Sequence, residues 1–199
     1  VESDNLPGFV VMTSVSKGTT CGQIFYDFYW GSGFLPSRYQ GVKFRGGGSP
    51  VLYVENPDGM TAALKRGLLD DIGKINRLKY QRVQDPEIET RIAQYEMAYR
   101  MQTGVPELTD LSEEPQHVLD LYGPQVKEQG TFAYNCLMAR RLVERGVRMV
   151  QVYNGCSSGD EWDTHHDNFN RHKKLMRNVD QGCAGLLADL KSRGMLEDT

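Results

Sequence analysis

Apolar residues recur at helical spacing over much of the first half of the chain. Five of them predict a helix over residues 64–78, namely Leu64, Leu68, Ile72, Ile75 and Leu78. Asp85 and Pro86 then start a second helix as its N-cap and first helical residue. We expect the two helices to form an antiparallel hairpin. Residues 104–125 follow as a proline-punctuated connection, with a short helical turn around residues 118–121.

Shorter apolar runs predict strands. Phe9–Met12 is apolar and β-branched, which is typical of a buried strand, and residues 51–54 predict a short extended piece. Residues 147–153 predict a further strand. It follows a helix that Thr131 caps and Gly146 ends, and a loop and a long helix come after it. Helix, strand, loop and helix in that order indicate an α/β fold with a mostly parallel sheet.

Residues 15–50 have little periodicity and contain many glycines and aromatic residues, so we expect irregular structure there. A long irregular segment in a compact domain is often functional. Trp30, in this segment, is a candidate substrate-binding residue that could stack on a ligand. A hydrophobic lid or a subunit contact is the alternative role for the same aromatic residues. The run Gly46–Gly48 lacks the Lys-Ser/Thr sequence that completes a phosphate-binding loop.

Length and charge exclude some classes of protein. A chain of 199 residues with 39% hydrophobic and 25% charged residues suits one domain with a real core. The net charge of −3 gives no basic excess, so nucleic acid is not an expected partner. No apolar stretch approaches the roughly 20 residues that a membrane span needs.

The residues with the most chemistry follow the 147–153 strand. This segment contains Asp160, Trp162, Asp163, His165 and His166. Ligands bind at the carboxyl ends of strands in open α/β sheets, and carboxylates with imidazoles are a usual ligand set for Zn²⁺, Mn²⁺ or Fe²⁺. The spacing lets Asp163 and His165 share one ion. The alternative is a solvated acidic loop in which Asp163 or Asp167 caps the next helix.

Other candidates have simpler explanations. Trp162 could line a sugar-like pocket or pack beneath the loop. His172 lies on the apolar stripe of the last helix, where a core or interface role is expected, and His117 is expected at the surface. Cys136 and Cys183 sit in helical patterns and are expected to be buried. A disulfide between Cys21 and Cys156 remains open, because sequence alone does not give connectivity.

Several segments share a distinctive sequence pattern, namely Leu6–Val11, Trp30–Ser37, Tyr39–Val42, Arg91–Gln102, Val105–Leu111, Ala139–Arg148, and Trp162–Asp163 with His165. They resemble the DUF1501 family of domains of unknown function, and they occur in the family's order over essentially the whole chain. The family is similar to the alkaline-phosphatase and sulfatase superfamily. The resemblance therefore implies a mostly parallel sheet between helices, with a metal site at its carboxyl edge. Asp163 and His165 match that superfamily's metal ligands, whereas His166 and Asp160 are weaker matches.

The resemblance also implies a function. It suggests a metal-dependent hydrolase of phosphate or sulfate esters, with a small-molecule or polysaccharide substrate and a divalent metal (Zn, Mn, Ca or Fe). Twin-arginine export to the periplasm or the cell exterior is implied as well. The superfamily's nucleophile and remaining ligands match nothing within residues 1–199, so we expect this chain to be an incomplete central part of one domain, inactive alone. The alternative is a non-catalytic exported binding or assembly protein that retains the fold.

Overall fold

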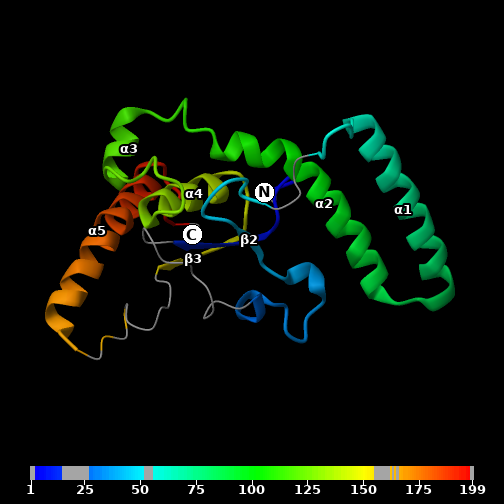
Figure 1. Cartoon of the computed structure of the whole chain (residues 1–199), viewed down its shortest axis with the longest axis horizontal. Coiled ribbons are helices and arrows are strands. Elements are labelled where there is room, and N and C mark those ends of the chain that lie inside the picture. The colour runs from blue at the N-terminus through cyan, green and yellow to red at the C-terminus, as the bar shows by residue number, and fades with distance from the viewer. Residues whose placement is uncertain are drawn as a thin grey trace.

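The structure is a computed structural model that describes residues 3–14, 27–51, 56–154, 162, 164 and 166–197. Within these residues the chain forms a small three-stranded sheet flanked by helices, with a helical hairpin extending from it (Figure 1). The predicted α/β class is therefore confirmed. No helix in the described part of the chain is long and apolar enough to cross a membrane.

The sheet has β1 (Phe9–Ser14) at its centre, between β2 (Val42–Phe44) and β3 (Met149–Asn154). Both neighbours run parallel to β1, with Val10 opposite Val42 on one side and Val150 on the other. The strands predicted from residues 9–12 and 147–153 are confirmed. β2 lies inside the segment predicted to be irregular, and that prediction is wrong there, because a three-residue strand is too short to show a period of two. Residues 52–54 of the predicted extended piece lie outside the described residues.

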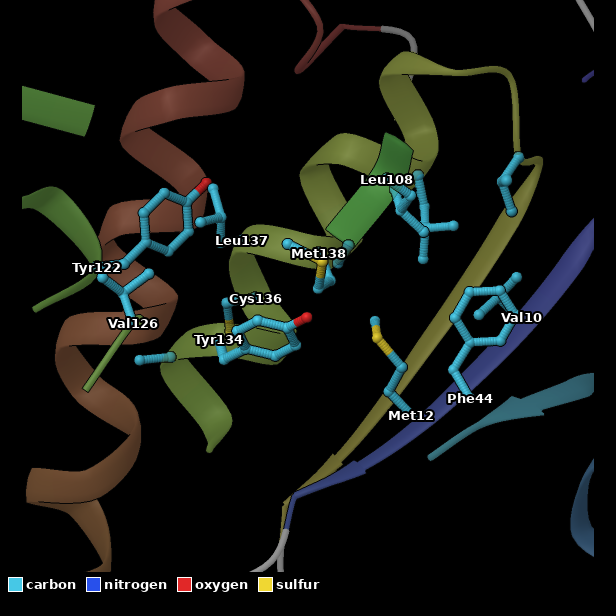
Figure 2. Close-up of a cluster of buried hydrophobic side chains, with 14 of the residues drawn as sticks. Val10, Met12, Phe44, Leu108, Tyr122, Val126, Tyr134, Cys136, Leu137 and Met138 are labelled. Atoms are coloured by element: carbon cyan, nitrogen blue, oxygen red, sulfur yellow. The ribbon is translucent and has the colours of Figure 1, made fainter. Parts of the chain in front are cut away.

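One face of the sheet packs on α4 (Phe132–Glu144), and this contact forms the main core (Figure 2). Met12 and Phe44 point from the strands toward Met138 of α4, whereas Leu137 lies on the other side of α4, beside Tyr122. Thr131 caps α4, since its Oγ1 accepts a hydrogen bond of 3.1 Å from the Tyr134 amide, as the sequence predicts.

On the far side of α4 lie α3 (Gln116–Tyr122) and α5 (Asn168–Ser192), which pack against α4 and each other. A glycine allows the close approach of α3 and α5: a Cβ at Gly185 would stand 2.6 Å from the carbonyl oxygen of Leu121. Cys136 is buried as predicted. Cys183 is exposed, so its prediction is wrong: it lies on the solvent side of α5, whereas Gly182 and Gly185 are buried.

The hairpin consists of α1 (Ala62–Val83) and α2 (Pro86–Thr109), which lie side by side (Figure 1). Asp85 is the N-cap of α2 and accepts a hydrogen bond of 3.0 Å from the Glu87 amide, which confirms the predicted start. The predicted end is wrong, because α2 continues through Pro106 to Thr109. Proline removes one helical hydrogen bond, but Val105 and Leu108 are buried in the core at this turn and hold it in place.

A buried ion-pair network fastens α4 to its neighbours. The Arg140 side chain is 2% exposed and lies 2.5 Å from Glu114, 2.7 Å from Glu144 and 3.0 Å from Asp189. Tyr122 of α3 donates a hydrogen bond of 2.9 Å to the Asp189 carboxylate. A buried charge is tolerated only where partners compensate its lost hydration, so this network links α3, α4, α5 and the segment before α3.

Candidate functional site

The parallel pairing of the strands defines the edge at which the candidate site lies. Ser14 at the end of β1 is opposite Asn154 at the end of β3. Both following segments therefore leave from the carboxyl edge of the sheet, where open α/β folds bind ligands. The segment after β3 contains Asp160, Asp163 and His165, which lie outside the described residues, as do Cys21 and Cys156. Their roles stay predictions.

A tight turn leads from this segment into α5. Asp167 is the N-cap and has a left-handed backbone with φ 47°, which aspartate adopts more readily than most residues. Its side chain makes no capping bond to the helix backbone and instead accepts a hydrogen bond of 2.8 Å from the Asn170 side chain. Asp167 is thus the N-cap residue, as the alternative interpretation predicts, but its side chain does not make the capping hydrogen bond.

After this turn, His172 of α5 contacts Thr164, a described residue of the segment that follows β3. Its Nδ1 lies 3.1 Å from the Asn168 carbonyl oxygen and 3.2 Å from Thr164 Oγ1. The Thr164 hydroxyl donates to the Asn168 side-chain oxygen, so its own oxygen is free to accept. Both contacts place the His172 proton on Nδ1, and the Nε2 atom of the neutral ring keeps its lone pair. Metal-binding histidines commonly have this arrangement, in which the second ring nitrogen donates to a backbone carbonyl.

His166 has a different environment. Its Nε2 atom lies 3.1 Å from Nη1 of Arg171. A guanidinium only donates hydrogen bonds, so this nitrogen accepts one from a permanent cation. A dication at the same nitrogen would have to displace Arg171 and would be repelled by it. Between these two described histidines, the geometry therefore leaves a ring nitrogen of His172 more available to a cation than that of His166.

The two candidate tryptophans differ in exposure. Trp162 is 37% exposed and meets His172 edge-on, with the ring centroids 5.9 Å apart. Trp30 is 2% exposed and lies near Tyr153, with the Lys43 ammonium 5.3 Å from its ring. Tyr153 and Lys43 alternate with the strand residues that face α4, so Trp30 covers the opposite face of the sheet. Trp162 therefore offers more ring surface to a ligand than Trp30 does.

A buried polar pair at the same edge escaped the sequence reasoning. Asn135 of α4 donates a hydrogen bond of 3.1 Å to the Ser14 hydroxyl, and both residues are at most 4% exposed. The signal was present, since Asn135 interrupts an apolar run of α4, and a buried amide needs a polar partner. The pair ties the end of β1 to α4 and helps hold the carboxyl edge in place.

The described residues alone do not complete a metal site. Among them, no group of three His, Cys, Asp or Glu side chains is arranged to hold an ion. His117 is exposed, as predicted. A groove of about 720 Å³ lies beside the opposite end of β3, where Val147–Val150 and α4 line it, away from the carboxyl edge. The candidate site thus depends on Asp163 and His165, which lie outside the described residues, while His172 contacts the described Thr164 between them in the sequence.

The fold defines the class of protein as α/β, with a small parallel sheet flanked by helices. The chain belongs to the family described as "Protein of unknown function (DUF1501)", whose model matches residues 1–199. No curated protein and no solved structure matches the chain.

Proposed function

We propose that this protein is a metal-dependent hydrolase of phosphate or sulfate esters, built on the alkaline-phosphatase and sulfatase type of fold, with Asp163 and His165 as metal ligands. One observation carries the proposal. The parallel pairing of β1 and β3 starts the 155–167 segment at the carboxyl edge of the sheet, so its carboxylates and imidazoles follow the edge that binds ligands in this fold class.

The donor types suit a divalent cation such as Zn²⁺, Mn²⁺, Ca²⁺ or Fe²⁺. Asp163 would supply a carboxylate and His165 an imidazole, and Nε2 of His172 would be a third donor, and the second nitrogen, with a lone pair. When bound, such an ion would supply Lewis-acid chemistry, in which it would polarise an ester oxygen or acidify a bound water. Neighbouring residues orient one of these donors, because the Thr164 hydroxyl and the Asn168 carbonyl oxygen both contact Nδ1 of His172. We assign no nucleophile.

The substrate would be an ester on a small molecule or a polysaccharide. Trp162 is more than one-third exposed beside His172, and an aromatic face of this kind can pack on the apolar face of a sugar ring. With this substrate class we also propose export to the periplasm or the cell exterior. Trp30 contributes to the sheet's second face in this proposal, and its substrate contact stays a prediction.

The second candidate is a non-catalytic exported binding or assembly protein. One observation favours it: large apolar side chains of α1 are exposed on the hairpin. Such a surface suits docking of a partner, and catalysis does not require it.

Hydrolysis of p-nitrophenyl phosphate and p-nitrophenyl sulfate tests the proposal. The full-length protein that contains residues 1–199 is assayed after chelation and after addition of Zn²⁺, Mn²⁺ or Ca²⁺, beside Asp163→Ala, His165→Ala and the control His166→Ala, because residues 1–199 alone are expected to be inactive. We expect metal-dependent turnover that both ligand variants reduce at least 100-fold and that His166→Ala retains. Turnover that chelation leaves unchanged, or no turnover of either ester by the protein with any of these metals, would favour the binding protein instead.

A further inference from the structure

The outer face of α1 carries a row of exposed apolar side chains. Leu64, Leu68, Ile75 and Leu78 are 58%, 50%, 65% and 62% exposed, and we call them the α1 seam. Gly73, half a helical turn around from this row, is the buried residue of α1. The seam therefore points away from the hairpin. Single exposed apolar residues are ordinary, but four aligned on one helix face mark an interaction surface.

The spacing of the seam indicates the shape of what covers it. Positions 64, 68, 71, 75 and 78 are separated by four, three, four and three residues, which is the spacing of a coiled-coil heptad. Asp71 occupies the middle position and forms an ion pair of 2.9 Å with Lys74. A narrow row with a charge at its centre suits a second helix. A membrane surface prefers a wide apolar face and would have to desolvate Asp71.

Charges beside the seam indicate the partner's chemistry. Lys65, Lys74 and Lys79 hold the positions that flank a heptad seam. Arg82 occupies the seam position that follows Leu78. A second copy of α1 fits poorly. A parallel pair would set Lys74 against Lys79 of the other copy, and an antiparallel pair would set Lys65 against Lys79. Both arrangements repel, whereas acidic flanks would pair with these lysines.

We propose that the α1 seam docks an amphipathic helix of another protein, with leucine or isoleucine at heptad spacing and Asp or Glu on both flanks. This goes beyond hydrolysis, because α1 packs chiefly against α2 and lies apart from the sheet edge of the candidate site (Figure 1). The hairpin would thus hold the protein in an assembly, whether or not the edge is catalytic.

Two synthetic peptides test the proposal. Both have four heptads with leucine at the seam positions, and they differ only in having glutamate or lysine at the flanking positions. Binding of each labelled peptide to the whole 199-residue chain is followed by fluorescence anisotropy at low salt. We expect the glutamate peptide to bind at least ten-fold more tightly than the lysine peptide, with the difference shrinking as salt is added.

Variants assign the binding to the seam. The double variant Leu68→Ser with Ile75→Ser should lower the affinity for the glutamate peptide at least ten-fold. Its circular dichroism spectrum should stay unchanged, because both side chains are exposed. Lys74→Glu with Lys79→Glu should reverse the preference between the peptides. The control Lys127→Glu with Lys191→Glu makes the same change in net charge at exposed sites elsewhere and should leave the preference intact.

The proposal fails if the two peptides bind equally, if neither binds, or if the serine variant binds as the wild type does. It also fails if the wild-type chain binds vesicles of anionic phospholipid and the serine variant does not. Sedimentation that shows a dimer abolished by the serine variant would instead identify a second copy as the occupant, and would equally overturn it.

Discussion

The Nε atom of Arg140 lies 3.0 Å from Oδ2 of Asp189, and both side chains are 2% exposed. Through this pair α4, which supports the sheet, is fastened to α5, which begins at the candidate site. The position of His172 on α5 relative to the carboxyl edge therefore depends on a contact at the other end of the helix.

Replacing Asp189 tests how much this contact contributes. Asp189→Asn removes the charge that faces Arg140 but leaves Glu114 and Glu144 in place. We expect the free energy of unfolding to fall by about 3 kcal/mol, near the low end of the cost of breaking a buried pair. Tyr122→Phe removes only the hydrogen bond to Asp189 and should cost about 2 kcal/mol. Urea denaturation measures both, and equal stability of Asp189→Asn and wild type would contradict the role assigned to the network.

Gly130 packs its backbone against Gly46, in the glycine-rich segment before α1. It has φ 84°, and a Cβ there would stand 2.2 Å from the carbonyl oxygen of Gly46. Backbone atoms cannot move aside as a flexible side chain can, so Gly130→Ala should destabilise the fold by about 3 kcal/mol.

Gly59→Ala is the matched control for this prediction. Gly59 also has a positive φ, 81°, but open space surrounds it. Only the backbone strain should appear there, about 1 kcal/mol. Thermal unfolding of the two variants gives the comparison. Equal shifts of Tm would show that the contact with Gly46 is absent.

Burial raises the pKa of the Cys136 thiol to about 12, from about 9 in an exposed chain. Above pH 9 the unfolded chain loses this proton before the folded chain does, so stability is complete below pH 9 and is lost as the pH rises toward 12. The slope from this group approaches 1.4 kcal/mol per pH unit. Burial also raises the pKa values of Tyr122 and Tyr134, which steepens the loss above pH 10.

Urea denaturation between pH 7 and 10 measures this dependence. Cys136→Ala should be less stable than wild type at pH 7, because it leaves a small cavity, but it should lose less stability per pH unit above 9. Cys183→Ala should keep most of the wild-type slope, because burial also raises the pKa of Cys183 but this thiol is more exposed than Cys136. The same slope in Cys136→Ala and wild type would refute the assignment.

The two described cysteines should also differ in reactivity. Cys183 is exposed and Cys136 is buried, and thiolate attack requires access to the sulfur. We expect iodoacetamide at pH 8 to modify Cys183 at least ten-fold faster than Cys136, as measured by peptide mass spectrometry, and the difference to disappear in urea. Equal rates in the folded protein would place Cys136 outside the core.

The sequence predicts elements whose signals are local. Asp85–Pro86 and Thr131 start helices because a side-chain oxygen next to the first turn satisfies free amides, and both starts are confirmed. β2 and the last turn of α2 carry no such signal. β2 exists because β1 lies beside it, and α2 passes Pro106 because the core holds Val105 and Leu108. The exposure of Leu64 and Ile75 was equally hidden, since helical spacing does not say which face has a neighbour.

The candidate site was predictable only in part. The position of its segment after a parallel strand followed from the order of elements, and the described strands agree. The contact of His172 with Thr164 did not follow, because it needs the left-handed turn at Asp167, which no hydrophobic pattern reveals. The contact of His166 with Arg171 spans the same turn. The ligand roles of Asp163 and His165 stay predictions.

Metal content tests these two residues most directly. The full-length protein that contains residues 1–199 and its variants Asp163→Ala, His165→Ala and His166→Ala are each loaded with Zn²⁺, Mn²⁺, Ca²⁺ or Fe²⁺, desalted and analysed by inductively coupled plasma mass spectrometry. The account predicts that wild type and His166→Ala retain one of these metals, and that Asp163→Ala and His165→Ala lose at least nine-tenths of it. Retention of the wild-type amount in both ligand variants, or no retained metal in wild type, would contradict it.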